Sequence, residues 1–346
     1  MTADLGRVGL AIGHATDVDG ATGLTVIRGV AGPCAGGVAV VGRATGTREL
    51  DALSSTSLSG RVDAVLLTGG SAYGLDAAAG VMRWMEERGR GFVVPRGVVP
   101  IVPAAVIFDL SPLGRFDARP SVAMAYDACE RASSTNIDEG AVGAGTGATV
   151  GKMAGPASAM KGGFGCAMES TADEQLHVAA AAVVNALGDV RDQAGRIIAG
   201  ARAPGGGFLD AARLLARGAP TDGATAGGGA ITPPMAAREG HHTTLAVVAA
   251  SVPMSRAQLG QLARAASAAL FRRITPVGTS FDGDVIFALA PVGETGAPPL
   301  AVETGMLASI EALAVAALER AIERAVRLAR GREGIPGLGD GGDAER

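Results

Sequence analysis

The sequence predicts a mixed α/β fold, and two kinds of pattern support that prediction. Short apolar runs rich in Val and Ile are bounded by Gly, as in buried strands, and stretches with helical spacing alternate with some of them. Of the 346 residues, 48% are hydrophobic, only 3% are aromatic and 53 are Gly. We therefore expect an aliphatic core in which small side chains let backbones approach closely.

The runs with strand character occur throughout the chain, and all are far shorter than the roughly 18 apolar residues of a membrane-spanning helix. Five lie before residue 110, and four follow it: Val8–Ile12, Gly23–Ile27, Gly37–Val41, Ala64–Leu67, Ala105–Phe108, Gly163–Met168, Val178–Val184, Leu245–Ala250 and Val285–Ala290.

Four stretches carry helical patterns. They are Leu75–Arg88, which ends at Gly89; Ser121–Ala132; a helix that runs to about Arg273; and the long Ala-rich stretch Thr304–Arg330. Ser255 and Gln258 stand at the spacing of a capping box, which places the start of the third helix.

The segment from about Arg202 to Gly240 differs from the rest. It holds two Gly triplets and the pair Pro233-Pro234, so it predicts a long flexible connection with a short helix at Leu209–Ala216. Residues 331–346 are Gly-rich and charged and predict a disordered tail. Without internal repeats, residues 1–330 are expected to form one integrated unit.

Composition argues against several classes of protein. The net charge of −4 is unlike the basic surface that nucleic-acid binding requires, and no apolar span suits a membrane. Cys34, Cys129 and Cys166 are far apart, which argues against a disulfide framework or a zinc site. Met1–Arg7 shows no secretory signal. We expect a cytoplasmic protein that uses no cofactor or metal.

Two Gly-rich motifs come close to known patterns without matching them. The segment at 143–148 has Ala148 where a dinucleotide-binding motif needs Gly, and Met153 stands where a P-loop needs Ser or Thr. Ser71 resembles the serine of a nucleophile elbow, but Tyr73 stands at the required Gly. We interpret the first as a tight turn and Ser71 as a helix N-cap.

Two stretches in the last third of the chain contain candidate catalytic residues. In E-G-H-H-T-T-L-A-V-V-A-A, from Glu239 to Ala250, a flexible linker leads into two threonines and a buried strand. Farther on, Asp282 and Asp284 flank a glycine at the start of another apolar strand, where alternation places both carboxylates on one face. The residues alone leave open whether the two aspartates are simply solvated at the strand edge.

With these motifs the chain resembles the family of L-aminopeptidase/D-esterases, β-peptidyl aminopeptidases and nylon-oligomer hydrolases, which are self-cleaving N-terminal-nucleophile-like enzymes. The resemblance covers nearly the whole chain in seven ordered motifs: V-G-L-A-I-G-H-A-T-D at 8–17, L-T-G-G-S-A-Y-G-L at 67–75, V-V-P-I-V-P-A-A-V-I-F-D-L at 98–110, M-K-G-G-F-G at 160–165, V-V-N-A-L-G-D-V at 183–190, H-T-T-L-A-V-V-A at 242–249 and F-D-G-D-V-I-F-A-L-A at 281–290.

The resemblance implies a four-layer αββα-type sandwich with its own connectivity. It also implies a precursor that is cut before its nucleophile into residues 1–242 and 243–346, which stay together in a homo-oligomer, a tetramer or larger. The implied substrate is a small peptide or related amide with a free amine. The family's functional positions fall on six residues: Thr243 as nucleophile, the acidic pair Asp282 and Asp284, Lys161, the oxyanion-contacting Asn185, and Tyr126 beside the scissile carbonyl.

The chemistry of these residue types fits that assignment. A threonine hydroxyl needs an adjacent base, and the α-amine freed by cleavage, with a reference pKa of roughly 7.7–8, suits that task. His242 precedes the nucleophile where the family commonly has Asn or Gly, which bears on the rate of self-cleavage. The alternatives are an acyltransferase of the ornithine-acetyltransferase type and a non-processing, ligand-binding member of the fold.

Overall fold

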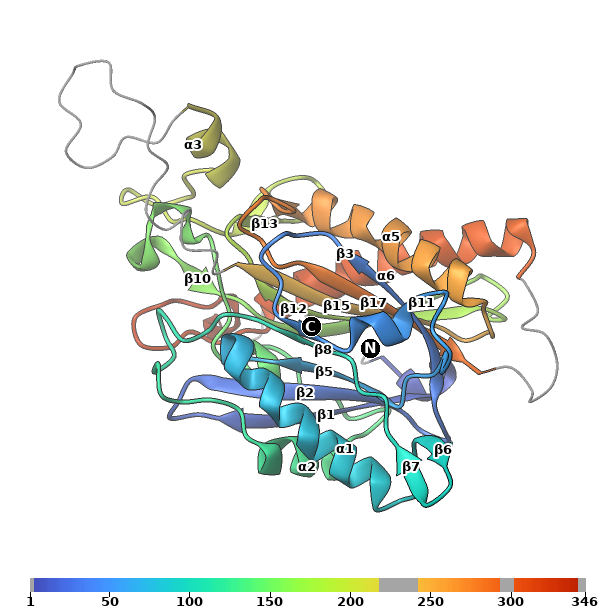
Figure 1. Cartoon of the computed structure of the whole chain (residues 1–346). Helices are drawn as coiled ribbons and strands as arrows, with labels where there is room; N and C mark the ends of the chain where they lie inside the picture. The colour runs from blue at the N-terminus through green and yellow to red at the C-terminus, as the bar shows by residue number, and fades with distance from the viewer. Residues whose placement is uncertain (1–2, 218–241, 293–301, 342–346) are drawn as a thin grey trace.

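The computed structural model describes residues 3–217, 242–292 and 302–341, and these form four layers (Figure 1). Two five-stranded sheets face each other. Helices α1 (Ala78–Glu86) and α2 (Val122–Arg131) cover the outer face of one sheet, and α5 (Arg256–Arg273) and α6 (Thr304–Arg327) cover the outer face of the other. The αββα arrangement expected from the sequence is thus confirmed.

The first sheet has the strand order β1-β2-β5-β8-β4. Its pairs are antiparallel except for β5 and β8, which run parallel. The strands are β1 (Leu10–Asp17), β2 (Thr22–Gly29), β4 (Thr47–Arg48), β5 (Ala64–Thr68) and β8 (Ala104–Val106).

The second sheet has the order β11-β12-β15-β17-β3. Strand β15 lies at its centre, antiparallel to β12 and parallel to β17. The strands are β3 (Cys34–Val40), β11 (Gly163–Ser170), β12 (His177–Asn185), β15 (Thr243–Ala250) and β17 (Val285–Pro291). Because β15 is the middle strand, its first residue is held from both sides.

Short elements complete the described chain. The smaller strands are β6 (Phe92–Val94), β7 (Gly97–Val99), β9 (Thr149–Val150), β10 (Met160–Lys161), β13 (Asp189–Arg191), β14 (Ile197–Ala199) and β16 (Ile274–Thr275). The short helices are α3 (Ala211–Arg217) and the 3-10 turns Leu5–Val8, Leu50–Leu53, Ser71–Ala77, Gly143–Gly145, Lys152–Ala154, Pro156–Ser158 and Leu338–Asp340.

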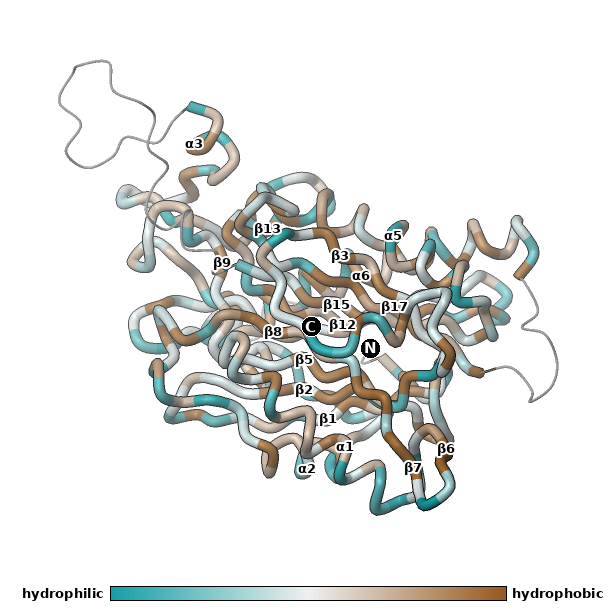
Figure 2. The backbone as a smooth tube through the Cα atoms, in the orientation of Figure 1, coloured by the Kyte–Doolittle hydropathy of each residue, from teal (hydrophilic) through white to brown (hydrophobic). Residues whose placement is uncertain are grey.

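Strand alternation distributes apolar side chains to both sides of the second sheet. On β12, Ala179, Ala181 and Val183 belong to the core between the sheets, whereas Ala182 and Val184 belong to the core beneath α5 and α6. Both faces are therefore buried, which explains why this strand reads as a continuous apolar run. Figure 2 shows the same concentration of hydrophobic residues along the strands.

Close packing of α6 on β11 accounts for part of the unusual Gly and Ala content. A side chain at Gly165 would collide with the backbone carbonyl of Ala321, and the buried face of α6 includes Ala314, Ala317 and Ala325. Small residues on both elements let the helix approach the sheet closely, so that aliphatic contacts replace large aromatic ones.

Most helix predictions agree with the structure. The capping box is present, with Gln258 N donating to Ser255 Oγ at 3.3 Å and Ser255 N donating to Gln258 Oε1 at 3.1 Å. The predicted helix at 75–88 begins instead as a 3-10 turn whose N-cap is Gly70, so Ser71 is not the cap. Most of the predicted flexible segment after α3 lies outside the described residues. In the described ranges no helix is long and apolar enough to cross a membrane.

The prediction of a disordered tail from residue 331 is wrong for residues 331–341. The chain turns back on itself between Arg332 and Ile335, and Ile335 is buried against Ala21 and Leu113. Ile335 and Leu338 anchor this segment, and backbone bonds from Lys161 N to the carbonyl of Pro336 and from Gly339 N to the carbonyl of Ala329 also hold it, although its composition suggests a solvated tail. Residues 342–346 lie outside the described ranges.

Candidate active site

The candidate site lies at one end of the second sheet, where three strands bring distant residues together. Thr243 begins β15 and pairs in register with Asn185, the last residue of β12. On the other side, His242 forms an isolated parallel bridge with Asp282, just before β17. Three segments that are far apart in the sequence therefore meet around the peptide bond between His242 and Thr243.

The carbonyl oxygen of His242 has two hydrogen-bond donors. The Thr243 hydroxyl donates to it at 2.7 Å, and the backbone N–H of Gly283 donates at 2.7 Å. Thr243 is only 5% exposed. The nucleophile expected from the sequence thus lies next to the carbonyl it would attack, and a backbone donor that sequence analysis missed polarises that carbonyl.

Gly283 occupies a position with no room for a side chain. A Cβ there would lie 2.6 Å from Thr243 Oγ and 2.7 Å from the carbonyl oxygen of Ala44, closer than the 3.0 Å that real Cβ atoms keep. The glycine between the two aspartates therefore allows β17 to approach the threonine hydroxyl.

Asp282 and Asp284 are buried, and both accept hydrogen bonds from the turn at Gly278 and Thr279. Asp284 accepts bonds from Thr244 N at 2.6 Å and Gly278 N at 3.1 Å, and Asp282 accepts one from Thr279 N at 2.7 Å. They are 1% and 2% exposed, respectively, so they are not solvated edge residues. Burial, together with the neighbouring Asp282 charge, raises the pKa of Asp284 to about 7.

The pKa of Asp282 also rises, chiefly because burial penalises its charged form. Bonds from Thr279 and the positive charge of Lys152 oppose that rise. Burial thus favours the protonated form of both carboxyl groups, and the shorter of the two hydrogen bonds to Asp284 comes from the N–H of Thr244, the residue after Thr243.

Lys152 is the functional candidate that sequence analysis missed. Its ammonium donates to Asn185 Oδ1 at 2.8 Å and to the Asn185 carbonyl at 3.0 Å, and Thr149 N also donates to Oδ1 at 3.1 Å. Burial lowers the pKa of Lys152 to about 7, while the charge of Asp282 opposes that shift. The sequence offered one indication of its importance, because lysine is rare in this chain and occurs only twice.

Asn185 lies beside Thr243, and its amide group also reaches the first sheet. Nδ2 donates to the carbonyl of Phe108 at 3.0 Å, two residues after the end of β8. Asn185 thus joins the end of β12 to the segment that follows β8.

Lys161 does not reach Thr243. Its side chain is fully buried, and Nζ donates to the carbonyls of Gly145 at 3.2 Å, Ala148 at 2.6 Å and Gly162 at 3.1 Å. Three ammonium hydrogens therefore have three backbone acceptors, and burial lowers the pKa of Lys161 to about 7. The lysine thus holds the Gly-rich turn at 143–148.

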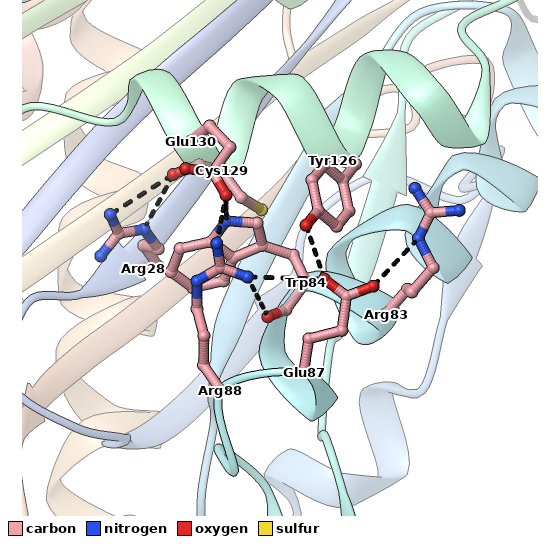
Figure 3. Close-up of polar contacts among 8 residues, drawn as sticks. All are labelled: Arg28, Arg83, Trp84, Glu87, Arg88, Tyr126, Cys129 and Glu130. Carbon is pink, nitrogen blue, oxygen red and sulfur yellow. Dashed lines mark hydrogen bonds and ion pairs between the residues drawn. The ribbon is translucent and has the colours of Figure 1, made fainter.

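Tyr126 lies in the outer helical layer, on α2 (Figure 3). Its hydroxyl donates to Glu87 at 2.5 Å, and the guanidinium of Arg83 lies 4.5 Å from its ring centroid. Close by, Trp84 donates to Glu130 at 2.8 Å, so that these contacts join α1 to α2. The structure places Tyr126 in this helix-to-helix network and not beside the His242 carbonyl.

The two described histidines other than His242 have hydrogen-bond partners of their own. His14 Nδ1 lies 2.9 Å from Thr25 Oγ1, His177 Nδ1 lies 2.7 Å from Ser170 Oγ, and His241 lies outside the described residues. Within the described ranges no group of three or more His, Cys, Asp or Glu is placed to hold a metal ion.

Comparison with known proteins assigns the family. Residues 7–338 match peptidase family S58. The chain belongs to this family. Among similar S58-type sequences, an uncharacterized aminopeptidase of Mycobacterium leprae is 40% identical over 330 residues, covering 91% of this chain and 85% of that protein. A 6-aminohexanoate-oligomer endohydrolase of Agromyces sp. is 31% identical over 289 residues, covering 81% and 72%.

Solved structures support the fold of this S58 member. A Burkholderia sp. beta-aminopeptidase aligns with a TM-score of 0.66 at 21% identity, covering 98% of this chain and 90% of its own. An L-aminopeptidase D-Ala-esterase/amidase from Ochrobactrum anthropi, described as a variant of the Ntn hydrolase fold, aligns with a TM-score of 0.68 at 19% identity, covering 95% and 88%. The expected family and fold are thus confirmed, and the chain is a peptidase or amidohydrolase.

Proposed function

We propose that this S58 member is a self-processing amidohydrolase whose nucleophile is Thr243. It matures by cleavage of the His242–Thr243 bond into residues 1–242 and 243–346. The observation that carries the proposal is the His242 carbonyl, held between the Thr243 hydroxyl and the Gly283 N–H, each at 2.7 Å.

Self-cleavage proceeds by an N-to-O acyl shift. Thr243 Oγ attacks the carbonyl carbon of His242, and the Gly283 N–H stabilises the negative charge that develops on the carbonyl oxygen. The C–N bond then breaks, and the proton that the Thr243 hydroxyl loses passes to the departing nitrogen, which leaves an ester between His242 and Thr243 Oγ. Water hydrolyses the ester, giving a carboxylate on His242, a free hydroxyl and a free α-amine on Thr243.

The released amine supplies the base for turnover. It accepts the hydroxyl proton as Thr243 attacks a substrate amide, then returns it to the leaving amine, and water hydrolyses the acyl-enzyme. The buried acidic pair is suited to orient this amine, because Asp284 already binds the N–H of the next residue, Thr244. A positive amine beside Asp284 also favours its ionised form.

The substrate we propose is a short peptide or related amide with a free amino group. The buried carboxyl groups of Asp282 and Asp284, just before β17, are acceptors beside Thr243 that suit the amino group of a substrate. The names of the similar proteins, an aminopeptidase and an oligomer endohydrolase, agree with amide hydrolysis.

We propose Lys152, in place of Lys161, as the lysine of the site. Its two bonds to Asn185 fix the side chain that lies across the β12–β15 register from Thr243. We assign Lys152 the task of holding Asn185 and of placing positive charge near the developing oxyanion, and Lys161 the task of holding the 143–148 turn.

The test is the covalent state of the purified full-length chain. Intact mass spectrometry and N-terminal sequencing should find two fragments, the second beginning at Thr243. Thr243→Ala should remain a single chain, whereas Thr244→Val, a matched change at the adjacent buried threonine, should still cleave. A second fragment that begins at Thr244 would overturn the assignment of the nucleophile.

Hydrolysis is separated from acyl transfer by the fate of the acyl group. An aminoacyl p-nitroanilide should be converted to the free amino acid, with little diversion to an added ornithine acceptor. Predominant acyl transfer to ornithine would favour the acyltransferase alternative instead.

A further inference from the structure

Asp109 is a fully buried carboxyl group in the segment that follows β8. Thr22 Oγ1 donates to Asp109 Oδ2 at 2.7 Å, and the backbone N–H of Gly70 donates to Oδ1 at 2.7 Å. Thr22 begins β2, and Gly70 lies two residues after the end of β5. Both carboxyl oxygens therefore act as acceptors, and the side chain joins three segments at one end of the first sheet.

Glycines make room for this carboxyl group. A Cβ at Gly69 would lie 2.1 Å from Asp109 Oδ2, and a Cβ at Gly147 would lie 2.7 Å from Asp109 Cβ. Gly70 has a φ of +80°, a backbone conformation that favours glycine. These glycines belong to the two Gly-rich motifs that resemble a nucleophile elbow and a dinucleotide-binding loop without matching either. Both motifs pack against one aspartate.

The backbone next to Asp109 holds the side chain of Asn185. The carbonyl of Phe108 accepts from Asn185 Nδ2 at 3.0 Å, while Lys152 Nζ donates to Asn185 Oδ1 at 2.8 Å. The same asparagine pairs in register with Thr243. The orientation of the amide beside Thr243 therefore depends on where the Phe108 carbonyl lies, and Asp109 anchors the chain at the very next residue.

We propose that Asp109 is a positioning residue that orients Asn185 beside Thr243. It acts through its chain neighbour Phe108, whose carbonyl takes an amide hydrogen of Asn185. The inference rests on the proposed function, in which Thr243 is the nucleophile and Asn185 lies beside the developing oxyanion. The role needs two hydrogen-bonding atoms of the right shape at residue 109, and it does not need their negative charge.

Two substitutions separate shape from charge. Asp109→Ala removes both acceptors, so kcat for an aminoacyl p-nitroanilide should fall roughly 10²-fold, the cost of a displacement of about 1 Å, while KM stays within roughly threefold. In Asp109→Asn the amide oxygen accepts from Gly70 N, and the amide nitrogen donates to the Thr22 hydroxyl, which is also an acceptor. This variant should therefore keep kcat within roughly threefold of native.

The matched control is Asp63, a second fully buried aspartate, which precedes β5 at the strand's other end. Its carboxyl group accepts from the backbone N–H of Ile101 at 2.9 Å and from Arg61 at 2.6 Å. Asp63→Ala should lower the urea midpoint of unfolding, as Asp109→Ala should, but it should keep native kcat. The comparison separates loss of stability from loss of position.

A spectroscopic readout follows Asn185 without any reaction. The chain has two asparagines, Asn136 and Asn185, so protein made with isotope-labelled asparagine gives two pairs of side-chain amide signals in nuclear magnetic resonance spectra. Asn136→Asp assigns the pairs. Asp109→Ala should shift the Asn185 pair and speed its hydrogen exchange while leaving the exposed Asn136 unchanged, whereas Asp63→Ala should shift neither pair.

Three results would overturn the proposal. They are native kcat or an unchanged Asn185 signal in Asp109→Ala, an equal loss of kcat in Asp63→Ala, and equal losses in Asp109→Asn and Asp109→Ala, which would assign the effect to charge. A native chain that stays uncut would contradict self-processing instead, and the amide signals would still decide whether Asp109 orients Asn185.

Discussion

Gly283→Ala tests whether the close approach of β17 to Thr243 governs self-cleavage. The added Cβ would lie 2.6 Å from Thr243 Oγ, which requires a displacement of at least 0.4 Å to reach the 3.0 Å limit. The carbonyl of Ala44, at 2.7 Å on the other side, prevents the new methyl group from moving away freely. The hydroxyl therefore has to rotate or shift, and the Gly283 N–H moves off the His242 carbonyl.

The expected cost follows from these displacements. Misplacing a reacting group by about 1 Å costs roughly 10²-fold in rate. Because two groups on the same carbonyl are disturbed, we expect self-cleavage to slow by about 10²-fold, equivalent to about 2.7 kcal/mol. Overpacking should also reduce the free energy of unfolding by about 1–3 kcal/mol.

The assay follows the loss of full-length chain by intact mass spectrometry after synthesis in a cell-free system. Gly260→Ala is the matched control, because it lies in helix α5 with open space around its Cβ position. That variant should cleave at the native rate and gain up to about 1 kcal/mol of stability from helix propensity. Native-rate cleavage in Gly283→Ala would refute the assigned role of this strand approach.

The remaining predictions separate the other site residues. Lys152→Met should slow self-cleavage by roughly 10²-fold, because Asn185 loses its ammonium donor. Lys161→Met should instead reduce the free energy of unfolding by about 3 kcal/mol, because buried carbonyls lose their donor. Cleavage rates and urea melts of both variants check these two expectations. Tyr126→Phe should keep native activity and lose at most about 1.5 kcal/mol, and an activity loss beyond tenfold would return the residue to the site. In Thr243→Ala, which keeps the chain intact, Asp284 has a pKa of about 7 against 3.8 when unfolded, so the folded state retains a proton that the unfolded state releases. Its free energy of unfolding should therefore fall as pH rises from about 4 to about 7, and adding Asp284→Asn should flatten that slope in urea melts.

Sequence patterns predicted most elements well because the deciding signals are local, whereas the four layers were implied by the resemblance to a known family. Ser255 and Gln258 specify a helix start, and apolar runs bounded by glycine specify buried strands. The tail was mispredicted because contacts with distant residues order it, among them those of Ile335 with residues more than 200 positions away. Local composition carries no information about such a contact.

In the candidate site, too, the residues marked by local motifs were predicted and those that depend on distant contacts were not. Thr243, Asn185, Asp282 and Asp284 stand on motifs tied to strand ends, and the structure brings all four together. The sequence did not show whether Lys152 or Lys161 belongs to the site, because that depends on which backbone groups each buried side chain contacts. A backbone donor such as the Gly283 N–H has no residue-type signature at all, so only the fold reveals it.

The order of strands in the second sheet has a consequence for the two halves of a cleaved chain. Strands β11, β12 and β3 precede residue 243, whereas β15 and β17 follow it. The later pair is inserted between β12 and β3, with hydrogen bonds to an earlier strand on either side. Neither fragment would then possess all five strands of the second sheet, and each would supply the strands of that sheet that the other lacks. Separating the fragments would amount to unfolding the enzyme, so a broken backbone would still behave as one cooperative structure.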